Sequence, residues 1–260
     1  MFIEERHRAI LDWLKEKGRI STSDIQDRFG VSYDSAKRDL RILEEKGLLK
    51  RTHGGALPLK KADSGGECHD LSSQERAESI KENYLSIARK AAAMIEPDDV
   101  VFLTSASIGF LVAKSLSPDL SCTVVVNSIS IAEVLRSYEK VTVLVAGGEM
   151  HKNGCFYDGF ALEMIGRLKF DKAFITSASI SAGFGLSIQR SRNLELINAV
   201  IRRSQSIVGL FPSEKVGFDS VMSICPADRL TYLITDWETS EEDLKGFDQL
   251  GISIVVTEPE

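Results

Sequence analysis

The sequence predicts an α/β chain in two parts, with a small helical module in front of a larger, doubly wound, mostly parallel sheet. Residues 1–59 contain three segments of helical periodicity and one short hairpin, whereas β-branched runs alternate with helical segments from residue 100 onward. Charge divides the chain at the same place. Residues 1–61 hold 14 Lys and Arg against 10 Asp and Glu, a net of +4, so the rest carries −10 to give the overall −6. A cationic module on an acidic body suggests that the front part meets a polyanion.

The front module is expected to begin with two helices. Apolar residues at helical spacing mark the first: Ile3, Ile10, Leu11 and Leu14. Gly18 is expected to end it. Ser21 can cap a short second helix, in which Ile25 and Phe29 face inward. Gly30 then allows a tight turn.

The third helix and a hairpin complete this module. Ser32 is expected to cap a helix that runs to about Lys46 and stops at Gly47. Its inner face is apolar: Ala36, Leu40 and Leu43. Residues 48–52 (LLKRT) are predicted to form a strand, and Gly54–Gly55 a hairpin turn. Together these elements predict a winged helix-turn-helix domain over residues 1–59, the alternative being a small bundle without a partner.

The outer face of the third helix is polar and cationic. With Ala36 inward, a rotation of about 100° per residue places Asp34, Lys37, Arg38 and Arg41 on the opposite side. Such a face fits the major groove of DNA, whereas intrahelical pairs with Glu44 or Glu45 are the structural alternative. The candidate DNA-binding residues are Ser32, Tyr33, Asp34, Ser35, Lys37, Arg38, Arg41, Lys50, Arg51 and His53.

Residues 60–73 (KKADSGGECHDLSS) lack periodicity and are rich in Gly, Ser and Asp, so they are predicted to be a linker to a second domain at 74–260. A long amphipathic helix is expected next. Its apolar positions are Ile80, Tyr84, Ile87, Ala91 and Ile95, and Pro97 is expected to end it.

Seven β-branched runs predict the strands of the second domain. They are Val100–Thr104, Thr123–Val126, Val141–Val145, Ala173–Thr176, Ile207–Leu210, Tyr232–Thr235 and Ile252–Val256. Helical patterns fill several gaps, at Ile108–Leu116, Ile129–Leu135, Leu162–Leu168 and Leu194–Arg203. Continuous apolar strands alternating with helices predict a Rossmann-like parallel sheet covered on both faces. In the expected strand order 3-2-1-4-5, the first and fourth strands are neighbours where the winding reverses.

One phrase occurs twice, as residues 102–109 (FLTSASIG) and 174–181 (FITSASIS). Each copy ends a predicted strand in a small, hydroxyl-rich loop, and these are the first and fourth strands. The likeness does not extend beyond the phrase, which argues against a duplicated domain. Because ligands bind where the winding reverses, the two loops are predicted to be two walls of one pocket.

Two stretches of the front module form a specific pattern: residues 5–20 (ERHRAILDWLKEKGRI) and 31–56 (VSYDSAKRDLRILEEKGLLKRTHGGA). With the α/β body, they resemble the DeoR family of bacterial transcriptional regulators over nearly the whole chain. The family usually has Thr-Ile-Arg-Arg-Asp-Leu where residues 35–40 read SAKRDL. Lys37 in place of Arg cannot make the bidentate guanine contact, so a changed operator preference is expected.

The resemblance implies a ribose-phosphate-isomerase-like body that senses a phosphorylated sugar. The effector-binding residues expected from the loops and from the family pattern are Thr104, Ser105, Ala106, Ser107, Asn127, Gly147, Gly148, Gly159, Thr176, Ser177, Ala178, Ser179 and Lys215. The chain departs from the family at both loops. Residues 104–108 (TSASI) replace an Asp-x-Gly-Thr-Thr-like loop, and residues 176–179 (TSAS) replace Gly-x-Asp-Gly, so each loop has lost an acid.

These departures leave two outcomes open for the ligand. Ser105 and Ser107, with the N–H groups of the following helix, can still hold a phosphate, and Lys215 can supply charge. Thr104 and Ala178 cannot accept hydrogen bonds from sugar hydroxyls as carboxylates do, so a changed or lost ligand is the alternative. Arg190 and Arg192 are either further phosphate partners or the solvated start of a helix.

The expected function is that of a DNA-binding repressor of a carbohydrate operon, relieved by a phosphorylated sugar. A fused sugar-phosphate isomerase is an alternative, but isomerisation needs a general base and neither loop offers a carboxylate, His or Cys. Glu149 is the nearest candidate base, and no enzymatic activity is expected. In a second alternative, the body serves only to oligomerise.

The expected partners are double-stranded operator DNA, the effector and further copies of this chain in a homodimer or larger assembly. No run of about 18 apolar residues suggests a membrane span, and the chain is expected to be cytoplasmic. Cys68, Cys122, Cys155 and Cys225 show no metal-ligand spacing and are expected to be reduced thiols. Neither a cofactor nor a metal is expected.

Overall fold

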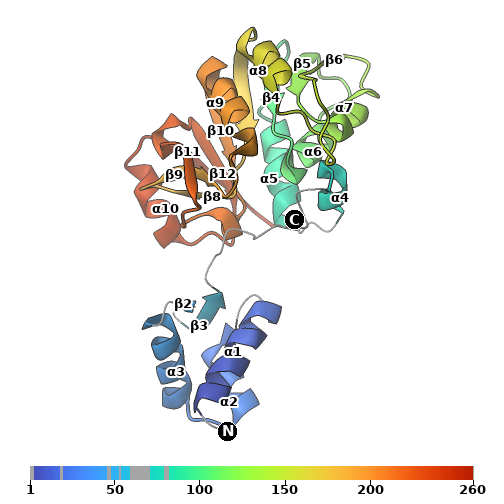
Figure 1. Ribbon diagram of the computed structural model, residues 1–260. Coiled ribbons are helices and arrows are strands. Elements are labelled where there is room, and N and C mark those ends of the chain that lie inside the picture. Colours follow the sequence, from blue (N-terminus) through green and yellow to red (C-terminus); the bar gives the residue numbers. More distant parts are fainter. Residues whose placement is uncertain are drawn as a thin grey trace. The chain divides into compact units, whose positions relative to one another are not determined.

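The computed structural model describes residues 3–17, 20–45, 48–52, 54–58, 71–78 and 82–259. The chain divides into two compact units, Met1–Lys61 and Ala62–Glu260, called below the N-terminal and C-terminal units (Figure 1). The predicted linker at 60–73 lies mostly outside the described residues. Its last residues differ from the expectation, because Ser73 begins a helix and is fully buried.

The N-terminal unit is a winged helix-turn-helix, as the sequence predicts. Its elements are α1 (Ile3–Lys17), β1 (Ile20–Ser21), α2 (Thr22–Phe29), α3 (Tyr33–Glu45), β2 (Leu49–Thr52) and β3 (Gly55–Pro58). The three strands form an antiparallel sheet in the order β1-β3-β2. The Ser21 hydroxyl accepts from the N–H of Asp24 at 3.0 Å and caps α2. Gly30 ends that helix in the left-handed conformation, with φ 61°.

The core of this unit confirms the inward faces predicted for its helices. Its buried members are Ile10, Trp13, Leu14, Ile20, Ile25, Ala36, Leu40, Leu43, Leu49 and Ala56. Ile3 is an exception, since its side chain is 58% exposed. The expected helix ends at Gly18, Lys46 and Gly47 lie outside the described residues.

The C-terminal unit is built on a parallel sheet of seven strands within the described residues. They are β4 (Val100–Leu103), β5 (Cys122–Val126), β6 (Val141–Val145), β7 (Phe170–Ile175), β10 (Ser204–Leu210), β12 (Tyr232–Asp236) and β13 (Ser253–Thr257). The order is β13-β12-β10-β7-β4-β5-β6, and each neighbouring pair is parallel. Counted along the chain and read from β6, this order is 3-2-1-4-5-6-7, so the predicted 3-2-1-4-5 order is confirmed and continues by two strands. The winding therefore reverses between β4 and β7.

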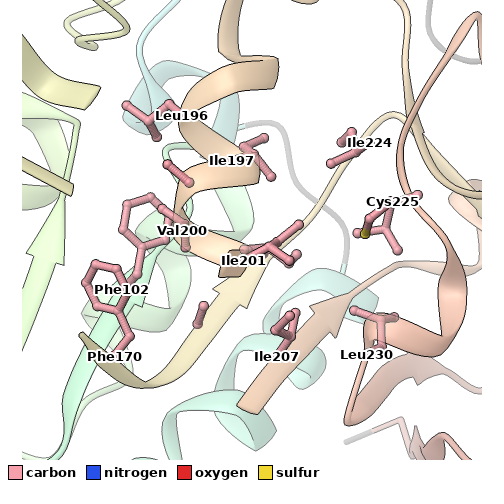
Figure 2. Packing of buried hydrophobic residues seen from close by; sticks show 14 of the residues in the cluster. Phe102, Phe170, Leu196, Ile197, Val200, Ile201, Ile207, Ile224, Cys225 and Leu230 are labelled. Carbon is pink, nitrogen blue, oxygen red and sulfur yellow. The ribbon is translucent and has the colours of Figure 1, made fainter. Parts of the chain in front are cut away.

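Helices cover both faces of this sheet (Figure 1). They are α5 (Glu82–Ala92), α6 (Ser107–Lys114), α7 (Ile129–Leu135), α8 (Gly159–Gly166), α9 (Leu194–Arg203) and α10 (Glu241–Asp248). Successive strand residues belong to opposite faces. Val101 and Leu103 of β4 share a hydrophobic cluster with α5, α6 and α7, whereas Phe102 belongs to the cluster of α8 and α9. Figure 2 shows the apolar stripe of α9, with Phe102 and Phe170 on one side and Ile224 and Cys225 on the other.

Several elements were not predicted. A small antiparallel sheet consists of β8 (Ser179–Ser181), β9 (Gly185–Ile188) and β11 (Met222–Cys225). The helices α4 (Ser73–Ala77) and α10 were also missed. The helix expected to run up to Pro97 instead ends at Ala92, and Ile80 lies outside the described residues.

No helix among the described residues is long and apolar enough to cross a membrane. In the same part of the chain, no group of three or more His, Cys, Asp and Glu side chains is arranged to hold a metal ion. Cys122, Cys155 and Cys225 are buried free thiols, and burial raises the pKa of the Cys225 thiol to about 11. Cys68 lies outside the described residues.

Candidate functional site

The outer face of α3 is exposed and cationic. Lys37, Arg38 and Arg41 are exposed, while Ala36 and Leu40 on the same helix are fully buried. An open hollow of about 460 Å³ lies on this face, and its lining residues are Asp34, Lys37, Arg38, Arg41 and Arg51. Four cations and one carboxylate thus surround a single hollow formed by α3 and β2.

The residues at the start of α3 have mainly structural contacts. The Ser32 hydroxyl accepts from the N–H of Ser35 at 3.2 Å and donates to the Ser35 hydroxyl at 2.9 Å, which caps the helix. Tyr33 is 49% exposed and offers a large ring beside this cap. Two further candidates from the sequence, His53 and the side chain of Lys50, lie outside the described residues.

Arg51 lines the hollow and also forms an ion pair. Its guanidinium lies 3.6 Å from the Glu44 carboxylate, and its backbone N–H donates to the same carboxylate at 2.9 Å. Glu44 therefore ties β2 to the end of α3. This pairing differs from the intrahelical pairs that were the structural alternative for Lys37 and Arg38.

A buried ion pair on the inner side of α3 was missed by sequence reasoning. Asp39 is 3% exposed and accepts from the Arg6 guanidinium at 2.7 and 3.1 Å. The Nε2 atom of His7 lies 3.0 Å from the same carboxylate. The hydrogen bond to Asp39 raises the pKa of Arg6. Two side chains of α1 therefore fix the rotation of α3 about its axis, and with it the direction of the Arg38 face.

In the C-terminal unit, the two hydroxyl-rich loops follow neighbouring parallel strands, as predicted. Thr104 follows β4, Thr176 follows β7, and the N–H of Thr104 donates to the carbonyl of Phe174 at 2.9 Å. Both threonines are buried, and the Thr176 hydroxyl has no hydrogen-bond partner in the part of the chain that the structure describes. A buried hydroxyl without a partner is costly, and a polar ligand would satisfy it.

Most polar groups of the second loop form hydrogen bonds within the C-terminal unit. The Ser177 hydroxyl donates to the carbonyl of Ser179 at 2.8 Å, and the Ser179 hydroxyl lies 2.9 Å from that of Ser187. The N–H of Ala178 donates to the carbonyl of Ser187 at 3.1 Å. These bonds belong to the small sheet, so Thr176 is the side chain of this loop best placed to bind a ligand.

Gly109 locks the first loop against α6. A Cβ atom at this position would lie 1.9 Å from the carbonyl oxygen of Thr104. Only glycine therefore allows the first turn of α6 to pack directly on the loop. The backbone path at 104–107 is fixed by this contact.

The other glycine and amide candidates form the neighbouring loops. Asn127 is buried and donates to the carbonyl of Phe156 at 2.9 Å. Gly148 packs against the carboxylate of Asp158, which caps α8. The N–H of Glu149 is the main donor that lowers the pKa of Asp158. By contrast, added Cβ atoms at Gly147 and Gly159 would meet nothing closer than 3.9 Å, so neither glycine is sterically required.

Two residues that hydrogen bond to Ser105 were not identified as site residues from the sequence. The Tyr157 hydroxyl hydrogen bonds to Ser105 and Asn153, and burial raises the pKa of Tyr157 to about 12. This phenol therefore keeps its proton at neutral pH. On the other side of Ser105, the Arg76 guanidinium donates to its carbonyl at 2.9 Å. An extended polar cluster thus surrounds the first loop.

Lys215 ends a short 3-10 turn (Ser213–Lys215) that follows β10, and it lies near the second loop. The residue that follows it, Val216, forms a bridge with Ile180, the neighbour of Ser179. The ammonium of Lys215 lies 5.9 Å from the centroid of the Tyr84 ring on α5. Three other sequence candidates, Glu149, Arg190 and Arg192, have exposed side chains.

The fold and these sites define a class: a winged helix-turn-helix module joined to an α/β sensor unit, as in bacterial transcriptional regulators. Two family models match. The DeoR-like helix-turn-helix domain covers residues 6–62, and the DeoR C-terminal sensor domain covers residues 81–237. The chain belongs to the DeoR family of transcriptional regulators.

Curated relatives agree with this assignment. The chain is 31% identical to the HTH-type transcriptional repressor GlcR of Bacillus subtilis over 99% of this chain and 98% of the relative. It is 30% identical to the lactose phosphotransferase system repressor of Staphylococcus aureus over 92% and 94%. Among solved structures, ribose 5-phosphate isomerase A from Methanocaldococcus jannaschii matches 53% of each chain with 15% identity and a TM-score of 0.37.

Proposed function

We propose that this regulator represses a carbohydrate operon by binding operator DNA through α3 and β2. The observation that carries the proposal is the open hollow on α3, which is lined by Lys37, Arg38, Arg41 and Arg51. Phosphates and guanine edges are the partners that such cations take. A homodimer is part of the proposal, because two copies bind two half-sites and reach the affinity of specific operator complexes. A cytoplasmic location follows from this role.

Arg51 is expected to contact the DNA backbone. Arg51→Ala should weaken binding to operator and random duplexes alike, and lower the salt slope by about one unit per bound subunit. Titrations at several salt concentrations measure this slope. Glu44→Gln is the matched control, since it breaks the same ion pair while keeping the guanidinium. An unchanged slope in Arg51→Ala would show that the residue serves only its pair with Glu44.

The effector is proposed to be a phosphorylated sugar held at the ends of β4 and β7. The amides that open α6, the hydroxyls of Ser105 and Thr176 and the charge of Lys215 suit a phosphate. One of the relatives is named as the repressor of a lactose phosphotransferase system, which supports this class of ligand. We propose no enzymatic role, because the two loops offer no general base.

Lys215→Ala is expected to weaken binding of the sugar phosphate at least about tenfold, since a charge-assisted hydrogen bond contributes roughly 1.5–3 kcal/mol. Operator affinity without ligand should not change. Calorimetry with glucose 6-phosphate, fructose 6-phosphate, ribose 5-phosphate and the unphosphorylated parents measures this. Lys245→Ala, at an exposed position on α10, is the control. Parent sugars that bind as well as their phosphates would exclude a phosphate site.

A further inference from the structure

The helix α4 lies between the two family modules. The helix-turn-helix match ends at residue 62 and the sensor match begins at residue 81, whereas α4 spans Ser73–Ala77. Ser72 caps it with a reciprocal capping box to Glu75. The helix belongs to the C-terminal unit and packs on α6 and α7. Among the described residues, α4 is the element of the C-terminal unit that comes first in the chain.

Two side chains attach α4 to the loops at the ends of adjacent strands. Arg76 donates to the carbonyl of Ser105, after β4, at 2.9 Å and to the carbonyl of Leu71 at 2.5 Å. The hydroxyl of Ser73 is fully buried and lies 3.1 Å from that of Ser128 and 2.8 Å from that of Ser130, after β5. Arg76 thus bridges the residues entering α4 and the first effector loop.

The peptide between Ser105 and Ala106 connects this bridge to the effector. Its carbonyl accepts from Arg76, and its N–H is the first amide before α6. The two groups belong to one planar, polarisable unit. A cation at the carbonyl makes the N–H a better donor, and an anion at the N–H makes the carbonyl a better acceptor. An anionic ligand and Arg76 therefore strengthen each other's hydrogen bonds through this peptide.

We propose that Arg76 couples the effector site to α4, because a phosphate bound before α6 tightens the Arg76–Ser105 bond and fastens α4. The inference rests on the proposed function, since it requires the phosphorylated effector to bind at this loop. Coupling of this kind is reciprocal, so docking of α4 also raises the affinity for the ligand. Arg76 acts as a positioning residue and Lys215 as a binding residue.

Hydrogen exchange of the full chain tests this coupling. Saturating sugar phosphate, taken as the tightest binder of the calorimetric panel, should slow exchange of the amides at 73–78 at least about fivefold, the low end of typical allosteric coupling. In Arg76→Ala this slowing should vanish, while protection of the first turn of α6 persists. Arg76→Lys, which keeps the charge with a single-point donor, should recover part of the effect. Arg136→Ala, at the exposed position that follows α7, is the control and should behave as the wild type.

The outcomes separate the coupling from the function on which it rests. If the ligand protects α6 in the wild type but leaves residues 73–78 unchanged, the coupling is wrong and the effector site stands. The coupling is equally wrong if Arg76→Ala keeps the full slowing at α4. If no sugar phosphate binds the wild type, the proposed effector class is wrong. The coupling is then wrong as well, because it requires that effector.

Discussion

Replacing Arg38 by alanine is expected to abolish specific operator binding while the fold stays intact. Arg38 is exposed, lines the hollow on α3 and does not contribute to the core of the N-terminal unit. A bidentate contact to guanine contributes about 1–3 kcal/mol of base discrimination, and the proposed dimer would make this contact twice. Affinity for operator should therefore fall roughly 30-fold or more, to the level of random duplex.

Footprinting titrations of operator and random DNA measure this loss. Arg8→Ala is the matched control, since Arg8 is exposed on α1 rather than α3. Arg38→Lys distinguishes a base contact from a phosphate contact, because lysine keeps the charge but not the planar fork. If lysine restores operator preference, Arg38 contacts the backbone. An alanine variant that protects the operator at wild-type concentrations would refute the assignment altogether.

Asp39→Ala is expected to destabilise the N-terminal unit selectively. The substitution removes the carboxylate that pairs with the Arg6 guanidinium. The Arg6 side chain is only 12% exposed, so its charge is left largely buried. Removing one member of a buried ion pair costs about 3–5 kcal/mol. For a unit of this size, the melting temperature should fall by about 12 °C or more. The C-terminal unit should melt as in the wild type.

Tryptophan fluorescence can resolve the two units. The chain has two tryptophans, Trp13 in the N-terminal core and Trp237 in the C-terminal unit, so a Trp237→Phe background reports on Trp13 alone. Asp27→Ala, at an exposed position on α2, is the control for loss of a carboxylate. If both variants melt at the same temperature, the pairing of Asp39 with α1 does not stabilise the unit.

The sequence predicted elements whose pattern repeats locally. The β-branched runs identified the strands of the parallel sheet, and their alternation with helices gave the order that brings Thr104 and Thr176 onto neighbouring strands. The small sheet was missed because its strands are short and contain Ser and Gly, which are typical of turns. Four of the predicted candidates on α3 line one hollow, namely Asp34, Lys37, Arg38 and Arg41, whereas Tyr33 does not.

Long-range partners were beyond the reach of local patterns. Asp39 stands in a charged stretch and looks exposed, yet its partner Arg6 lies 33 positions away on another helix. Arg76 follows a stretch with the composition of a linker, and only packing on the C-terminal unit reveals its contact with Ser105. Tyr157 likewise reaches Ser105 through the tertiary fold. Tertiary context, rather than propensity, decides the roles of these residues.

The contact between Gly109 and Thr104 limits how this sensor can evolve. Any mutation that adds a Cβ at position 109 forces the loop and α6 apart. Substitutions that move this backbone in small steps are therefore not tolerated. Side chains at 104–107 can change without moving that backbone. Relatives that respond to different ligands should therefore differ in the side chains that a constant loop backbone displays, and the departure from the family pattern expected at 104–108 would be a change of that kind.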